Sequence, residues 1–185
     1  AMPSATPQPT PQAAPTVFTW PVQGDILTDY SLEVLSYNPT MDDWRTHDGL
    51  DIASAAGTEV KAAAAGTVTA VLQDAMMGTT VVVEHGGGLT STYSNLASVP
   101  TVAVGDTVGA GSVLGSVGGT AIAESALASH LHFSMSLDGS TVDPLESLPI
   151  YTLSLPFLPD MQTAHGLSHA PSALYYSTSS GKKAR

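Results

Sequence analysis

Short runs typical of β-strands, separated by Gly-rich turns, constrain the fold of this chain more than any other feature. The clearest run is residues 79–85 (TTVVVEH), which three glycines separate from the alternating residues 89–96 (LTSTYSNL). This pattern predicts a β-hairpin. Other strand-like runs follow at short spacing, within residues 59–71, which are broken at Gly66, and within residues 113–117. Closely spaced strands with few helical patterns predict an all-β sandwich or barrel.

Composition divides the 185 residues into three parts. Residues 1–16 hold five prolines among Ala, Thr and Gln, which predicts an extended linker, either a tether or an end without a role. Residues 17–148 are predicted to be the folded domain, in which residues 121–128 (AIAESALA) alone favour a short helix. Residues 149–185 mix prolines, apolar residues and a polar end, so we expect partial packing followed by disorder.

The charge balance excludes several kinds of partner. Lys and Arg total 5 against 16 Asp and Glu, which gives a formal net charge of −11. Such a chain lacks the basic patches that bind nucleic acid or anionic lipid. It also has no cysteine, which excludes disulfides, thiol catalysis and Cys-type zinc sites. No apolar run approaches the ~20 residues that span a bilayer, so any membrane attachment is expected only through a segment preceding residue 1.

Two histidines stand close together in residues 129–135 (SHLHFSM). Side chains alternate between the two faces of a strand, so Leu131 and Phe133 are expected in the core, with His130 and His132 on the opposite face. Paired imidazoles on one face suit metal binding or acid–base catalysis. The alternative is a solvated face that carries histidine incidentally.

A second candidate motif lies in residues 45–52 (RTHDGLDI), where His47 and Asp51 are four residues apart. On a helix this spacing would place both on one side, but Gly49 and the strand-rich surroundings favour a loop that enters a strand. His47 is then expected before the turn and Asp51 on the strand. The alternative is an ordinary Asp-Gly turn with no chemical role.

Taken together, His47, Asp51 and His132 supply two imidazoles and one carboxylate. Three protein ligands with one position left for water form a catalytic zinc site. Water activated by zinc is able to attack a carbonyl near neutral pH. His130 is expected on the same face as His132, close enough to assist.

With these residues in this order, the chain resembles the M23 family of zinc peptidases, also called lysostaphin-type or LytM domains. The His-x-x-x-Asp and His-x-His motifs occur in order with further family-like segments within residues 57–68, 83–86 and 104–115. The resemblance covers roughly residues 17–148. It implies a small antiparallel β-sandwich of the LytM type, with a groove that holds Zn²⁺. It also implies hydrolysis of peptide cross-bridges or stems in bacterial peptidoglycan, at the cell envelope outside the cytoplasm.

The resemblance implies roles for individual residues. His47, Asp51 and His132 match the zinc ligands, and His130 matches a catalytic histidine beside the metal. Active members usually read Tyr-x-His-Leu where residues 93–96 of this chain read YSNL. Asn95 therefore stands where a second catalytic histidine is expected. Asparagine is able to donate a hydrogen bond to an oxyanion, but it transfers no proton near neutral pH.

Two further expectations follow from this segment. Tyr93 is two residues before Asn95, and on a regular strand the two side chains share a face, so Tyr93 is expected either in the core or lining the substrate groove. The loss of a catalytic histidine favours a weakened zinc metalloendopeptidase or, alternatively, a catalytically poor zinc-binding scaffold for an envelope protein. Residues 37–47 resemble the subgroup that includes stage II sporulation protein Q, which has such a role.

Overall fold

The computed structural model describes residues 13–149. Most of the predicted linker (residues 1–16) and all but Pro149 of the predicted C-terminal extension lie outside this range, so both stay predictions. Within the described range, no helix is long and apolar enough to cross a membrane.

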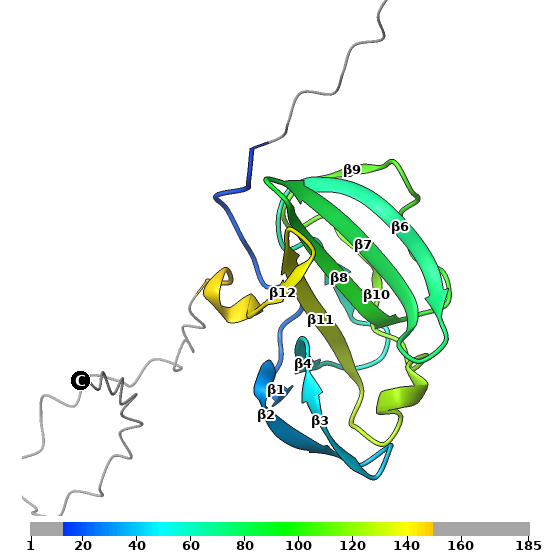
Figure 1. Ribbon diagram of the computed structural model, residues 1–185. Coiled ribbons are helices and arrows are strands. Elements are labelled where there is room, and N and C mark those ends of the chain that lie inside the picture. The colour runs from blue at the N-terminus through cyan, green and yellow to red at the C-terminus, as the bar shows by residue number, and fades with distance from the viewer. Residues whose placement is uncertain (1–12, 150–185) are drawn as a thin grey trace, which may run out of the picture. The chain divides into compact units, whose positions relative to one another are not determined.

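The regular secondary structure of the described chain is almost entirely β-strand, as the sequence predicts (Figure 1). It contains twelve strands and two short 3₁₀ helices, η1 and η2. The elements are β1 Ile26–Thr28, β2 Ser31–Asn38, β3 Asp43–His47, β4 Leu50–Ala53, β5 Glu59–Lys61, β6 Gly66–Asp74, β7 Gly78–Gly86, β8 Leu89–Leu96, β9 Thr107–Val108, β10 Val113–Ser116, η1 Ile122–Glu124, β11 His130–Leu137, β12 Ser140–Val142 and η2 Pro144–Glu146.

One large sheet orders its strands β1-β4-β11-β8-β7-β6-β9, and β12 pairs with β11. Every pairing in it is antiparallel, which confirms the predicted class. The predicted hairpin is present as β7 and β8. Its turn needs glycine, because Gly86, Gly87 and Gly88 all have positive φ angles (84°, 60° and 76°), which other residues rarely adopt.

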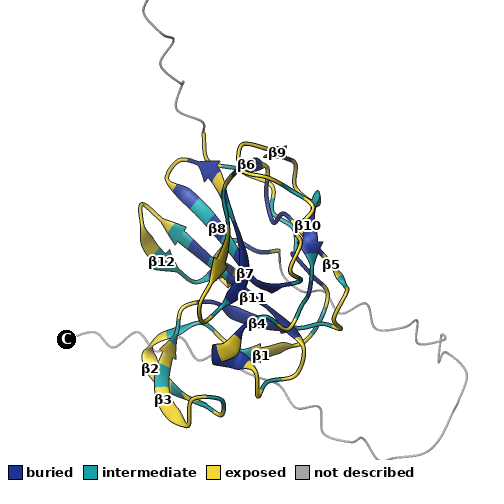
Figure 2. Cartoon of the chain, turned by 90° about the vertical axis from the view of Figure 1, so that its right-hand side faces the viewer, coloured by how far each residue is buried: buried dark blue, intermediate teal, exposed yellow. Residues whose placement is uncertain are grey.

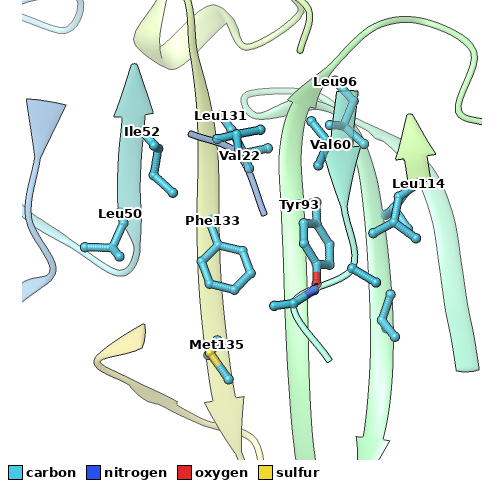
Figure 3. Packing of buried hydrophobic residues seen from close by; sticks show 14 of the residues in the cluster. Val22, Leu50, Ile52, Val60, Tyr93, Leu96, Leu114, Leu131, Phe133 and Met135 are labelled. Atoms are coloured by element: carbon cyan, nitrogen blue, oxygen red, sulfur yellow. The ribbon is translucent and has the colours of Figure 1, made fainter. Parts of the chain in front are cut away.

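The core lies on one face of this sheet. Leu131, Phe133 and Met135 of β11 are each no more than 1% exposed, as the alternating pattern predicts. The small β5–β10 sheet supplies the opposite layer, with Val60 and Leu114 fully buried against the same cluster (Figure 3). The result is a β-sandwich, and the other face of β11 is left free for polar side chains.

The structure corrects the prediction of a helix at residues 121–128. Only Ile122–Glu124 is helical, as a single 3₁₀ turn, and Ala121 gives it no side-chain cap. Eight residues without a cap are too few to sustain an α-helix. The segment is instead a loop that connects β10 to β11.

A two-stranded ribbon, β2–β3, extends beside the large sheet. Figure 2 shows that most of it is exposed, whereas β7, β8 and β11 are largely buried. The second strand of this ribbon ends at His47, so the ribbon leads directly into the candidate site.

Candidate metal centre

Three strands bring the predicted ligands together. His47 is the last residue of β3, Asp51 lies in β4 and His132 lies in β11. Asp51 is the register partner of His132 in the antiparallel β4–β11 pair. The expected arrangement, with His47 before a turn and Asp51 on the following strand, is therefore the one observed.

The turn between β3 and β4 depends on Gly49. A Cβ atom at this position would lie 2.6 Å from the backbone oxygen of Phe133 and 3.0 Å from His132 Nε2. Real Cβ contacts to a backbone atom are not this short. Glycine thus allows β4 to approach β11 closely enough to place Asp51 against His132.

The donor atoms of the three residues converge. Asp51 Oδ1 lies 2.9 Å from His132 Nδ1 and 3.2 Å from His47 Nε2. The two ring nitrogens, His47 Nε2 and His132 Nδ1, are 3.3 Å apart. A zinc ion with bonds of about 2.0–2.2 Å holds its tetrahedral ligands roughly 3.3–3.5 Å apart, so the donor set fits zinc.

The outer nitrogen of each imidazole is also engaged. His47 Nδ1 lies 3.0 Å from the carbonyl oxygen of Asp29, to which it donates, and this leaves Nε2 facing the cluster. His132 Nε2 lies 3.6 Å from Asp48 Oδ1. Such outer partners fix the ring orientation of metal-binding histidines.

The cluster favours ionised groups. Burial raises the pKa of Asp51, but hydrogen bonds from His132 and His47 outweigh it and hold that pKa below its usual value. Burial likewise lowers the pKa of His132, whereas Asp48, Asp51 and Glu124 together raise it well above the ordinary value. The carboxylate of Asp51 is therefore ready to bind a cation, and a bound metal would replace the imidazole protons.

A fourth residue, Glu124 of η1, lies in the cluster, and sequence reasoning missed it. Its Oε1 lies 3.3 Å from His132 Nδ1 and 4.0 Å from His47 Nε2. The donor atoms of His47, Asp51, Glu124 and His132 all lie within 4.8 Å of one another. Glu124 is a single acidic residue in an alanine- and serine-rich loop, so no spacing in the sequence marks it.

His130 lies beside the cluster with both of its ring nitrogens engaged. Its Nδ1 lies 2.7 Å from the carbonyl oxygen of Ala128, and its Nε2 lies 3.0 Å from Glu124 Oε2. Burial lowers the pKa of His130, but the hydrogen bond to Glu124 and the smaller effects of Ala128 and Asp51 raise it overall. The predicted proximity of His130 to the ligands is therefore observed.

The structure corrects the role that the sequence predicted for the side chain of Asn95. Its side chain is buried, with Nδ2 donating to the carbonyl oxygen of His130 at 3.0 Å and Oδ1 accepting from the amide of Ala121 at 3.0 Å. Both hydrogen bonds go to backbone groups rather than to the clustered donor atoms. The expected role as an oxyanion donor therefore does not match these contacts. Asn95 has a positive φ of 62°, which turns its side chain out of the strand alternation.

The prediction that Tyr93 lines a substrate groove is wrong. Tyr93 is fully buried in the core, with its ring centroid 5.2 Å from that of Phe133 (Figure 3). Its hydroxyl oxygen accepts a hydrogen bond from the amide of Ala63 at 2.7 Å. The alternative expectation, a core aromatic, is the correct one.

Two hollows meet at His132. One lies beside the β2–β3 ribbon and is lined by Tyr37, Arg45 and the clustered side chains. The other lies on the polar face of the large sheet and is lined by residues that include Thr80 and Ser94. His132 lines both hollows, so an elongated molecule that occupied both would pass over the cluster.

Comparison with known proteins gives consistent results. The model of peptidase family M23 matches residues 45–144, more than half of the chain and all of the clustered residues. A DD-carboxypeptidase/endopeptidase, Mpg of Neisseria meningitidis serogroup B, is 32% identical over 108 residues, which are 58% of this chain and 24% of Mpg. Stage II sporulation protein Q of Bacillus subtilis is 33% identical over 114 residues, which are 60% of this chain and 38% of that protein.

The chain thus spans well under half the length of these two relatives. Among solved structures, the SpoIIQ–SpoIIIAH pore-forming complex superposes with a TM-score of 0.60 at 26% identity, covering 73% of this chain and 92% of that chain. The similarity therefore extends to one protein named as a peptidase and to one found in a complex with a protein partner.

Proposed function

The chain belongs to peptidase family M23, and from this premise we propose that it is a zinc metalloendopeptidase-type domain acting on peptide cross-bridges or stems of peptidoglycan. His47, Asp51 and His132 would hold the metal. The observation that carries the proposal is the convergence of their three donor atoms, 2.9–3.3 Å apart, where two hollows meet.

The bound metal and the residues around it would have different roles in the reaction. When bound, zinc supplies Lewis-acid polarisation of a carbonyl and activation of water. The backbone carbonyl of Asp29 would orient the imidazole of His47, and the carboxylate of Asp48 lies near the outer nitrogen of His132. His130 would supply an imidazole beside the reacting peptide, provided that its Nε2 is released from Glu124, because a free nitrogen is needed to move a proton.

The surroundings suit a peptide. Peptide groups both donate and accept hydrogen bonds, and the second hollow is lined by polar residues that include Thr92, Ser134 and Asp48. Tyr37 and Arg45 of the ribbon line the other side. We infer that an extended peptide crosses the site between the ribbon and the sheet. Peptidoglycan lies outside the cytoplasmic membrane, which is where this function would place the domain.

A second candidate function is a zinc-binding scaffold that holds an envelope protein partner. Asn95 favours it, since its amide is bound to the backbone and transfers no proton. The complex of SpoIIQ with SpoIIIAH supports it by similarity. A scaffold of this kind keeps the metal site for its structure and does not need turnover.

Digestion of purified peptidoglycan separates the two candidates. Zinc-loaded protein should release new amino termini and soluble peptides, detected by chromatography and mass spectrometry, and His132→Ala should release none. Glu84→Gln, which changes an exposed residue of β7, serves as a control and should release as much peptide as the unmodified protein. If neither the zinc-loaded protein nor its Glu124→Ala variant, which lacks the fourth side chain of the cluster, releases anything from peptidoglycan or from isolated cross-bridge peptides, the peptidase proposal fails and the scaffold is favoured.

A further inference from the structure

Glu124 occupies an unusual place for a loop carboxylate. It is only 6% exposed, and its two oxygens face different partners. Oε1 lies toward the ligand atoms of His132 and His47, while Oε2 lies 3.0 Å from His130 Nε2. The carboxylate therefore bridges the candidate metal position and the histidine beside it.

We propose that Glu124 is a fourth protein ligand of the metal, so that the site in this structure is closed to water. The inference rests on the proposed zinc site of His47, Asp51 and His132. A site with four protein ligands is structural, whereas a hydrolytic site keeps one position for water. Glu124 thus restrains hydrolysis, which proceeds only in the fraction of molecules whose Glu124 carboxylate has left the cluster, so that Glu124→Ala should raise the rate.

The spacing of the donor atoms supports this assignment. The atoms of the three predicted ligands lie 2.9–3.3 Å apart, and Glu124 Oε1 adds a fourth at 3.3 Å from His132 Nδ1 and 4.0 Å from His47 Nε2. Three of these separations, at 3.2–3.3 Å, match the roughly 3.3–3.5 Å between tetrahedral zinc ligands, and those of 2.9 Å and 4.0 Å would need a small adjustment when the metal binds. Glu124 Oε1 therefore stands at the corner that a water molecule would otherwise take.

The charge of the cluster supports it as well. Asp51 is 1% exposed and Glu124 is 6% exposed, so two carboxylates are buried together. Among the described residues, every ion pair recorded for either of them is with a histidine, and none is with Lys or Arg. Two carboxylates that are buried together need a compensating positive charge, which the histidines supply only when protonated and which a divalent cation would supply directly.

Asn95 acts as a positioning residue for Glu124. Its amide binds the backbone of Ala121 and of His130, the two ends of the loop that carries Glu124. The residue that departs from the Tyr-x-His-Leu pattern therefore fixes the loop. The asparagine at position 95 thus takes the place of the expected second histidine and also holds the carboxylate of Glu124 at the metal position.

The ribbon holds the same loop from the other side. Asn38 Nδ2 donates to the carbonyl oxygen of Ala123 at 3.4 Å, and the amide of Ala126 donates to Thr40 Oγ1 at 3.0 Å. These residues lie at the tip of the β2–β3 ribbon, which also lines a hollow beside the cluster. A molecule that displaces the ribbon would loosen the loop and allow Glu124 to withdraw.

Metal binding by the full chain tests the proposal without relying on activity. Zn²⁺ affinity is measured by competition with a chromophoric chelator, and the visible absorption of the Co²⁺-loaded protein reports the number of ligands. Glu124→Ala should weaken Zn²⁺ binding by about tenfold or more and change the Co²⁺ spectrum. The matched control is Glu146→Ala, because Glu146 is exposed and also ends a three-residue 3₁₀ helix.

Further variants make the outcome decisive. Glu124→Gln nearly preserves the shape of the side chain and carries the test if the alanine variant has a lowered melting temperature. Asn95→Gly tolerates the positive φ, keeps every ligand and should shift the Co²⁺ spectrum in the same direction as Glu124→Ala. If both Glu124 variants bind Zn²⁺ and absorb like the unmodified protein, Glu124 is not a ligand and the inference is overturned. If the unmodified protein itself binds no Zn²⁺, the proposed function fails with it.

Discussion

Asp51 and His132 face each other across the antiparallel strands β4 and β11, with Asp51 Oδ1 2.9 Å from His132 Nδ1. The hydrophobic pattern of the two strands sets this pairing. Ile52 and Leu131, the neighbours of the pair, are fully buried on the core face. A shift of one residue would turn them to solvent, so the packing of the core also fixes the spacing of the two ligands.

The first prediction concerns the metal. His132→Ala should remove most of the zinc found by elemental analysis and weaken zinc affinity by at least about tenfold, because it deletes a donor nitrogen from the centre of the cluster. His165→Ala, which deletes an imidazole outside the described residues, is the control and should retain its zinc. Equal zinc content in the two variants would contradict the assignment of His132 as a ligand.

The second prediction concerns Gly49. A methyl group there would meet the backbone oxygen of Phe133 at 2.6 Å, so β4 would have to move away from β11. Gly49→Ala should lower the free energy of unfolding by about 1–3 kcal/mol, measured by urea denaturation, and weaken zinc binding as well. Gly119→Ala places its methyl group in open space and should change the free energy by less than about 0.5 kcal/mol.

The sequence predicted those parts of the molecule that depend on strand periodicity. Leu131 and Phe133 entered the core, and His130 and His132 lie on the other face of β11, because regular strands alternate their side chains. The glycines between β7 and β8 predicted their turn for a similar local reason. These features are encoded within a few neighbouring residues.

The loop features were not predictable in this way. Glu124 lies in a loop that begins at Ala121. The amide of Ala121 donates a hydrogen bond to Asn95, which is 26 residues away in the sequence, and this contact helps to place the loop against the cluster. Periodicity also failed at Asn95 itself, because its positive φ breaks the alternation that was used to place Tyr93 beside it. Both outcomes depend on contacts between distant parts of the chain.

The third prediction tests the place of Tyr93. Its hydroxyl oxygen accepts the hydrogen bond of the buried amide of Ala63, and burial raises the pKa of Tyr93 to about 12, so the phenol stays neutral. Tyr93→Phe leaves that amide without a partner and should cost about 1–3 kcal/mol of unfolding free energy. Tyr37→Phe, at an exposed position, should cost less than about 0.5 kcal/mol. Equal stability of the two variants would show that Tyr93 is not held as described.

The last prediction concerns pH and His85, which is not one of the clustered residues. His85 is fully buried, with Nδ1 2.9 Å from the carbonyl oxygen of Ala65 and Nε2 2.7 Å from Ser91 Oγ. Burial lowers the pKa of His85 below 6.5, and the hydrogen bond to Ala65 offsets this only in part. The folded chain therefore keeps His85 neutral at a pH where the unfolded chain has begun to protonate it.

The sign of the effect follows from proton binding. Between the lowered pKa of the folded state and the ordinary value of 6.5, the unfolded state binds a proton that the folded state does not. The contribution of His85 to the free energy of unfolding is thus complete above pH 6.5 and decreases as the pH falls below that value.

Urea denaturation of the unmodified protein and of His85→Gln from about pH 7.5 to about pH 5 isolates this contribution, because every other titrating group is shared. The stability difference between the two should be largest at the upper end and should shrink below 6.5. A difference that stays constant or grows on acidification would mean that His85 is protonated in the folded protein.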